Sequence, residues 1–217
     1  MGEKMMTRDD NGLSDDGHWG LDVVVIGGCG HVGLPLAIAL ADRGLRTVAY
    51  DISEETTAQV NRGELPFLED GAGRVLQRTL SGGTFRATTD PAVVGDAEFL
   101  IVVLGTPVDE HLNPDPQKIP QALDRCSQFF RDGQLLILRS TVYPGTTALI
   151  ERMVNGIGVD MEVAFCPERI AEGRAMIELF SLPQIVGSRT PAAGKRAEWL
   201  FTRLTRKVIH VEPEEAE

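Results

Sequence analysis

Short apolar runs alternate with stretches of helical periodicity along most of the chain. The runs are rich in Val, Ile and Leu, as buried strands are, and they predict strands at 23–26, 47–50, 84–88, 97–104, 134–138, 162–165, 184–186 and 207–211. Helical periodicity follows the first run and predicts further helices over 53–62, 117–130, 146–154, 174–179 and 192–204. Another helix is predicted between 62 and 84, ending near residue 80. This alternation predicts a doubly wound, mostly parallel α/β sheet of the Rossmann type with helices on both faces.

The first 20 residues differ from the rest of the chain. They are polar and rich in Asp and Gly, so we expect 1–20 to form a flexible tail, with Trp19 marking where order begins. The alternation of strands and helices then continues to residue 211. We therefore expect one domain over 21–211.

A glycine-rich turn joins the first predicted strand to the first predicted helix. The sequence Gly28-Cys29-Gly30-His31-Val32-Gly33 is a GxGxxG motif. We assign the tight turn to Gly28, the close approach of a pyrophosphate to Gly30, and the packing of helix on strand to Gly33. The N-terminus of the helix offers free N–H groups to phosphate. The motif alone is weak evidence, but between two strands it predicts a dinucleotide site.

An aspartate ends the second predicted strand. Asp51 follows Gly33 by 18 residues, the place where a carboxylate accepts hydrogen bonds from a ribose diol. Glu54 and Glu55 follow, with no arginine nearby in the sequence, and this negative charge would repel a 2′-phosphate. The pattern therefore favours NAD over NADP as the cofactor.

Composition narrows the class of protein further. The chain has 217 residues, 42% of them hydrophobic, and a net charge of −11, which argues against nucleic-acid binding. No apolar stretch is long enough for a membrane span, and the N-terminus has no signal-peptide core. Three cysteines without a CxxC pair indicate reduced thiols, so we expect a cytoplasmic protein without a metal site.

Unusual polar residues follow three neighbouring inner strands. The predicted strands are followed by Gly105-Thr106-Pro107, by Arg139-Ser140-Thr141-Val142-Tyr143-Pro144-Gly145, and by Cys166-Pro167-Glu168-Arg169. Ligands of open α/β sheets bind outside the carboxyl ends of the strands, and proline there ends a strand and lets the chain turn. These loops are therefore expected to converge beside the glycine-rich turn.

Four motifs in order make the chain resemble a known family. From about Asp22 to the C-terminus the sequence is similar to the N-terminal domain of the UDP-glucose/GDP-mannose dehydrogenases, the nucleotide-sugar 6-dehydrogenases. The resemblance rests on IGGCGHVGLPLA, GTPVDEHLNPD, RSTVYPGTT and CPERIAEGRAM. The Pro-Glu-Arg-Ile form looks most like the UDP-N-acetylmannosamine dehydrogenase branch.

The resemblance implies an NAD-dependent reaction in which the C6 alcohol of a UDP-sugar is oxidised twice, to a carboxylate. It implies that Thr141 and Glu168 lie beside the reacting carbon, and that Glu168, Arg169 and Ile170 contact the sugar nucleotide. The residues it assigns to the cofactor are Gly28, Cys29, Gly30, His31, Val32, Gly33, Asp51, Thr106, Ser140, Thr141 and Glu172. A basic residue that the family often carries near Thr56 is missing here.

The family's catalytic cysteine and lysine have no counterpart in this sequence. They follow a long connecting helix, and 212–217 resembles the start of that helix. We therefore expect the chain to bind NAD without turnover, and the full-length enzyme to be a homodimer or larger. Two alternatives stay open: a free-standing NAD-binding or regulatory module, and another NAD-dependent hydroxyacid dehydrogenase.

Overall fold

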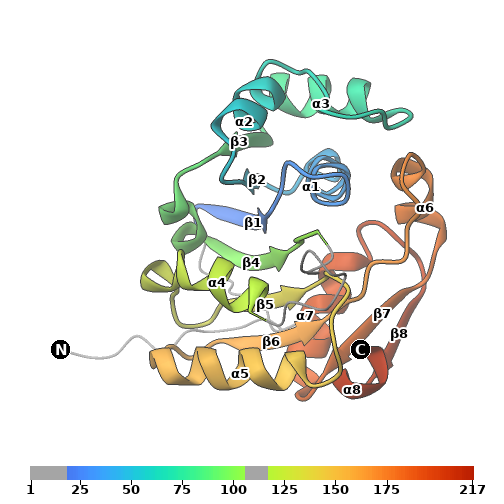
Figure 1. Ribbon diagram of the computed structural model, residues 1–217. Helices are drawn as coiled ribbons and strands as arrows, with labels where there is room; N and C mark the ends of the chain where they lie inside the picture. The colour runs from blue at the N-terminus through green and yellow to red at the C-terminus, as the bar shows by residue number, and fades with distance from the viewer. Residues whose placement is uncertain (1–18, 106–116) are drawn as a thin grey trace, which may run out of the picture.

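The computed structural model describes residues 19–105 and 117–217, which form one eight-stranded sheet (Figure 1). The strands lie in the order β3-β2-β1-β4-β5-β6-β7-β8. Their bounds are β1 Leu21–Ile26, β2 Thr47–Tyr50, β3 Phe85–Thr88, β4 Ala97–Val102, β5 Leu135–Leu138, β6 Glu162–Phe165, β7 Gln184–Ser188 and β8 Val208–Val211. Residues 1–18 of the predicted tail lie outside the described residues. Trp19, where order was expected to begin, is buried.

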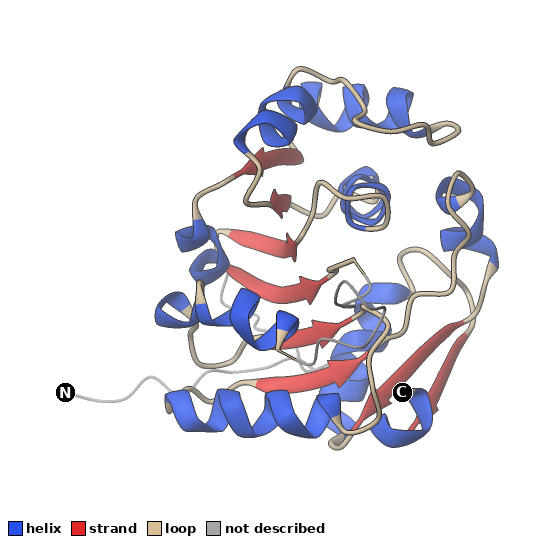
Figure 2. Cartoon of the chain, viewed as in Figure 1, coloured by secondary structure: helices blue, strands red, loops and turns tan. Residues whose placement is uncertain are grey.

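Helices cover both faces of this sheet (Figures 1 and 2). They are α1 Gly33–Asp42, α2 Glu54–Asn61, α3 Ala72–Ser81, α4 Lys118–Asp124, α5 Thr146–Ile157, α6 Ala175–Ser181, α7 Pro191–Phe201 and α8 Pro213–Ala216, with short 3₁₀ turns at Pro91–Asp96 and Ser127–Phe129. In the part of the chain that the structure describes, no helix has the length and apolarity needed to cross a bilayer.

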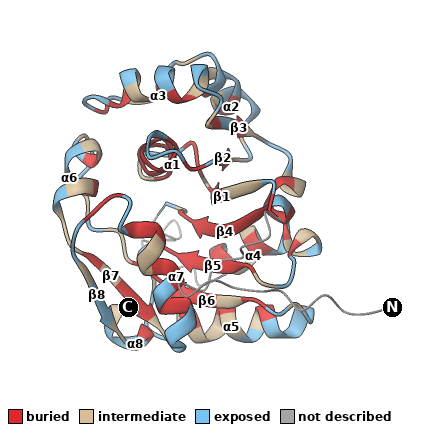
Figure 3. Cartoon of the chain, turned by 180° about the vertical axis from the view of Figure 1, so that it is seen from behind, coloured by how far each residue is buried: buried red, intermediate tan, exposed pale blue. Residues whose placement is uncertain are grey.

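Side chains alternate between two hydrophobic cores along the central strand. Val23 and Val25 of β1 belong to the core beneath α1, α3, α6 and α7, whereas Val24 and Ile26 belong to the core beneath α4 and α5. Figure 3 shows the central strands β4 and β5 buried, whereas α3 and α5 carry exposed residues. A strand with both faces covered must be apolar throughout, which explains the uninterrupted run at this position.

The predicted doubly wound, mostly parallel α/β sheet is confirmed, with two differences in detail. Strands β1 to β6 are parallel, but β7 runs antiparallel to β6. The helix expected over 117–130 ends at Asp124 and is followed by a separate 3₁₀ turn. The hydroxyl of Ser127 donates to the carbonyl oxygen of Asp124 (2.9 Å), and such side-chain bonds compete with helix continuation.

Candidate functional site

The turn after β1 is constrained at two consecutive glycines, Gly27 and the predicted Gly28. Gly27 has φ +78°, and a Cβ there would lie 2.1 Å from the carbonyl oxygen of Val103. A Cβ on Gly28 would lie 2.6 Å from the carbonyl oxygen of Val25, three residues earlier, and 2.7 Å from Cα of Ala49 in β2. The tight turn and the close strand contact therefore require two consecutive glycines.

The other two glycines of the motif have the predicted geometry. A Cβ on Gly33 would lie 2.4 Å from the carbonyl oxygen of Gly27, so the first turn of α1 packs directly on the loop. A Cβ on Gly30 would meet only one atom, 3.7 Å away, and the residue is exposed. Among the described residues, the N–H groups of His31 and Val32 have no acceptor. Open space beside free N–H groups at a helix N-terminus fits a pyrophosphate.

His31 also contributes its side chain to the site. Its ring stacks on Phe67 with 4.2 Å between ring centroids. The stack joins the glycine loop to the loop that precedes α3.

Asp51 lies at the end of β2, beside the glycine loop. Its Oδ2 accepts a hydrogen bond from the N–H of Cys29 (3.1 Å), and its Oδ1 accepts one from the N–H of Ser53 (3.2 Å). Each carboxylate oxygen can accept more than one hydrogen bond. Asp51 is half-buried and therefore keeps acceptor capacity for a ribose diol in a fixed orientation.

A cavity of about 510 Å³ opens where the strand order reverses between β1 and β4. Its lining includes Gly27, Gly30 and Asp51. It also includes Lys118, the first residue of α4, and Arg125, which directly follows α4. No arginine lies near Asp51 in the sequence, but Arg125 lines the same cavity. Both cations come from a part of the chain that is distant from Asp51 in sequence.

The loop after β5 is tied to the end of β4 by Ser140. The buried hydroxyl of Ser140 accepts a hydrogen bond from the N–H of Leu104 (2.7 Å). Thr141, next in the chain, is exposed. Thr106, expected on the same side, lies outside the described residues.

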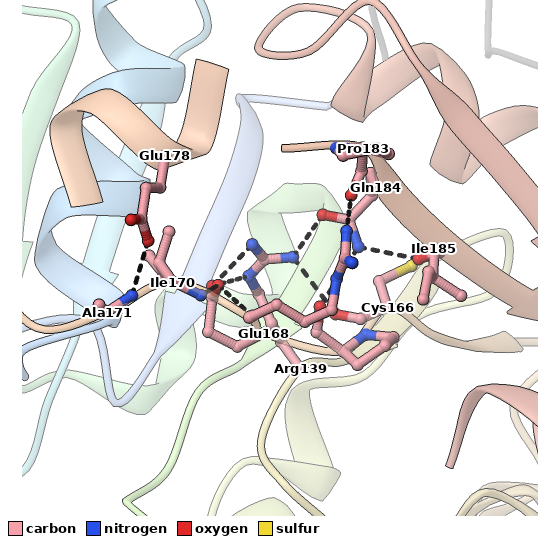
Figure 4. A network of polar contacts seen from close by, with 11 residues as sticks. Arg139, Cys166, Glu168, Ile170, Ala171, Glu178, Pro183, Gln184 and Ile185 are labelled. Atoms are coloured by element: carbon pink, nitrogen blue, oxygen red, sulfur yellow. Dashed lines mark hydrogen bonds and ion pairs between the residues drawn. The ribbon is translucent and has the colours of Figure 1, made fainter. Parts of the chain in front are cut away.

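A buried ion pair with Arg139 holds Glu168, which lies on the segment after β6 (Figure 4). The Arg139 side chain is 3% exposed, and its Nε and Nη2 lie 2.7 and 2.6 Å from Oε2 of Glu168. The Nη1 group of Arg139 donates to the carbonyl oxygen of Cys166 and to Oε1 of Gln184 (2.8 Å). Sequence analysis placed Arg139 at the strand end without a role. The feature of the sequence that could have indicated a role for Arg139 is a charged residue directly after an apolar strand.

The second oxygen of Glu168 organises the turn that follows it. Oε1 accepts hydrogen bonds from the N–H groups of Arg169 (2.6 Å) and Ile170 (2.8 Å). The guanidinium of Arg169 donates to the carbonyl oxygen of Pro183, and the side chain of Ile170 packs against the larger core. Glu172 is exposed on the same loop. Glu168 thus has four donors for its four lone-pair positions.

The three cysteines are free and buried. Burial raises the pKa of Cys29 and of Cys166 to about 12, and that of Cys126 to about 11. Thiols held neutral in this way are poor nucleophiles. The residues that the structure describes contain no cluster of His, Cys, Asp and Glu able to hold a metal.

Known proteins are similar to this chain in sequence and in fold. The profile of the UDP-glucose/GDP-mannose dehydrogenase family, NAD binding domain, matches residues 22–205. The UDP-N-acetyl-D-mannosamine dehydrogenase of Salmonella typhi is 30% identical over 186 residues, and that of Pyrococcus horikoshii is 31% identical over 183 residues. These alignments cover 80% and 82% of this chain but 44% of each relative, so the chain spans less than half the length of either.

Solved structures give the same result. The UDP-D-ManNAc dehydrogenase from Pyrococcus horikoshii superposes with a TM-score of 0.84 at 29% identity, over 90% of this chain and 48% of that one. GDP-mannose dehydrogenase from Pseudomonas aeruginosa gives 0.83 at 25% identity, over 90% and 47%. A 3-hydroxyisobutyrate dehydrogenase from Mycobacterium tuberculosis gives 0.64 at 15% identity and shares the fold alone. The predicted family and branch are confirmed: this chain belongs to the UDP-glucose/GDP-mannose dehydrogenase family and is its NAD-binding domain.

Proposed function

We propose that this domain supplies the cofactor half of an enzyme that oxidises the C6 alcohol of a UDP-sugar to a carboxylate. The observation that carries the proposal is the convergence of three features at one point of the sheet. The glycine loop, Asp51 and a cavity of about 510 Å³ meet where the strand order reverses. The names of the relatives support a UDP-sugar as the substrate.

The residues of the domain divide between the two ends of the cofactor. Gly30, His31 and Val32 would hold the pyrophosphate through backbone groups, and Asp51 would accept the ribose hydroxyls. The cofactor supplies a hydride acceptor when bound. Ser140 and Thr141 would line its nicotinamide end, since the loop after β5 lies on the β4 side of the switch point.

Glu168 and the two residues after it are the proposed link to the substrate. Because the Glu168 carboxylate is held by Arg139 and by two backbone N–H groups, its orientation does not depend on the substrate. It would orient a water or a hydroxyl only by exchanging one of these donors. Arg169 is exposed and would reach the sugar nucleotide by releasing the carbonyl oxygen of Pro183.

We expect the isolated chain to bind NAD without oxidising a sugar, because its three thiols are buried and its relatives are more than twice its length. Calorimetry with NAD tests the first part, and a saturable heat of binding supports it. Incubation with NAD and a panel of UDP- and GDP-sugars, followed at 340 nm, tests the second. Steady NADH production by the chain alone would contradict the absence of turnover, and failure to bind NAD would refute the whole proposal.

A further inference from the structure

The C-terminal helix α8 is docked beside the loop that follows β5. Its contact with β7 is close, since a Cβ on Gly187 would lie 2.8 Å from Cβ of Ala216 and 3.0 Å from Cα of Pro213. Arg189 adds an ion pair to Glu214 of α8 while it also binds Glu151 of α5 (2.7 Å). The last residues of the chain are therefore packed on β7 and linked to α5 through Arg189.

Glu217, directly after α8, caps the N-terminus of α5. Its Oε2 accepts a hydrogen bond from the N–H of Gly145, and its Oε1 accepts one from the N–H of Thr147, both at 2.6 Å. The N-cap position of α5 is Gly145, at φ +90°, which has no side chain to bond to the helix. A carboxylate from about 70 residues away in sequence thus replaces the missing local cap, where negative charge is also favoured by the helix dipole.

This cap fixes one end of the loop over 141–144. The other end is fixed by the hydrogen bond from the Leu104 N–H to Ser140. Between these anchors, Thr141 and Tyr143 are exposed, and the Thr146 hydroxyl donates to the carbonyl oxygen of Tyr143 (2.7 Å). The position of the exposed residues therefore depends on the two anchors.

We propose that Glu217 is a positioning residue for the loop over 141–144, and through it for the nicotinamide end of the cofactor. The inference rests on the proposed function, which assigns this loop to the nicotinamide. The adenosine end is served by the opposite half of the sheet, where Asp51 lies. Loss of the cap should therefore weaken binding of the nicotinamide half of the cofactor and leave the adenosine half unchanged.

Binding of the two halves of the cofactor can be measured separately with two ligands, using the full 217-residue chain. NADH carries both ends, whereas ADP-ribose lacks the nicotinamide, and calorimetry gives the affinity of each for the wild type, Glu217→Gln and Glu217→Ala. Glu214→Gln is the matched control. It removes a carboxylate from the same helix, and its partner Arg189 keeps Glu151. The amide NMR signals of Gly145 and Thr147 report the cap itself.

We expect Glu217→Ala to weaken NADH binding by up to about fivefold, the factor that a typical N-cap contributes to the population of the ordered state. Glu217→Gln should lose less, since its amide oxygen still accepts one N–H, and ADP-ribose affinity should stay constant in all variants. Equal losses for both ligands would overturn the inference. The inference would also be overturned if Glu217→Ala shifted the amide signals of Gly145 and Thr147 but left NADH affinity unchanged. It would equally be overturned if these two signals in the wild type showed no hydrogen bond to Glu217. A wild type that binds NADH no more tightly than ADP-ribose would instead refute the proposed place of the loop, and the inference with it.

Discussion

Replacement of Arg139 by methionine tests the ion pair that holds Glu168. The methionine side chain fills much of the space of the arginine stem but donates no hydrogen bond. The substitution leaves the Glu168 carboxylate, 12% exposed, with its two backbone donors only. It also removes the donor to the carbonyl oxygen of Cys166 and to Oε1 of Gln184.

The expected loss of stability is large for a single substitution. Removal of one partner of a buried ion pair costs about 3–5 kcal/mol, because the other charge stays buried without compensation. Whole domains are stable by about 5–15 kcal/mol, so Arg139→Met should remove a substantial part of the free energy of unfolding. With a urea m-value of about 2 kcal/mol/M, the unfolding midpoint should fall by roughly 1.5–2.5 M.

Urea unfolding followed by circular dichroism measures this loss. Arg62→Met is the matched control, since Arg62 forms an exposed pair with Glu64 and should lose less than about 1 kcal/mol. The double variant Arg139→Met/Glu168→Leu removes both charges and should regain a large part of the loss. A loss below about 1 kcal/mol for Arg139→Met, or a double variant no more stable than the single one, would refute the reasoning.

Three further predictions concern the cofactor loop and a thiol. Gly27→Ala should cost about 3 kcal/mol in urea unfolding, whereas Gly30→Ala should keep stability but lose NAD binding by calorimetry; the opposite pattern would exchange their roles. Asp51→Ala should weaken NAD binding about 10- to 100-fold, and unchanged affinity would remove Asp51 from the ribose. Burial raises the pKa of Cys166 from 9.0 to about 12, so its stabilising effect is complete below pH 9 and is lost as the pH rises toward 12. The unfolded thiol ionises first, which costs about 1.4 kcal/mol at pH 10. Cys166→Ala should therefore lose less stability than wild type between pH 8 and pH 10, and equal losses in unfolding titrations would contradict this.

The sequence predicted the order of the fold because each buried strand is a short apolar run between turn residues. The bounds predicted for 47–50 and 162–165 agree with β2 and β6. The direction of β7 was not predictable, because an apolar run carries no information on whether its neighbour is parallel or antiparallel. The end of α4 was missed because helical periodicity does not reveal a local bond such as that from the Ser127 hydroxyl to the carbonyl oxygen of Asp124.

The candidate site was predictable where a residue acts through its place in a motif. Gly30, Gly33 and Asp51 have the surroundings expected from their spacing. The requirement for a second glycine at Gly27 was missed, because spacing alone does not reveal its left-handed φ. The contacts of Arg139 and Glu217 join distant segments, and no local pattern encodes them.

The place of β1 in the middle of the sheet has a consequence for synthesis of the chain. Leu21 pairs with Ala97, 76 residues later, whereas Val23 pairs with Thr47 on the other side. Ribosomes add roughly 5–20 residues per second, so one edge of β1 waits roughly 4–15 s for its partner. An apolar strand edge left unpaired for seconds is a template for aggregation. We therefore expect the seam between β1 and β4, beside which the cavity of the folded domain opens, to be the segment most in need of a chaperone during translation.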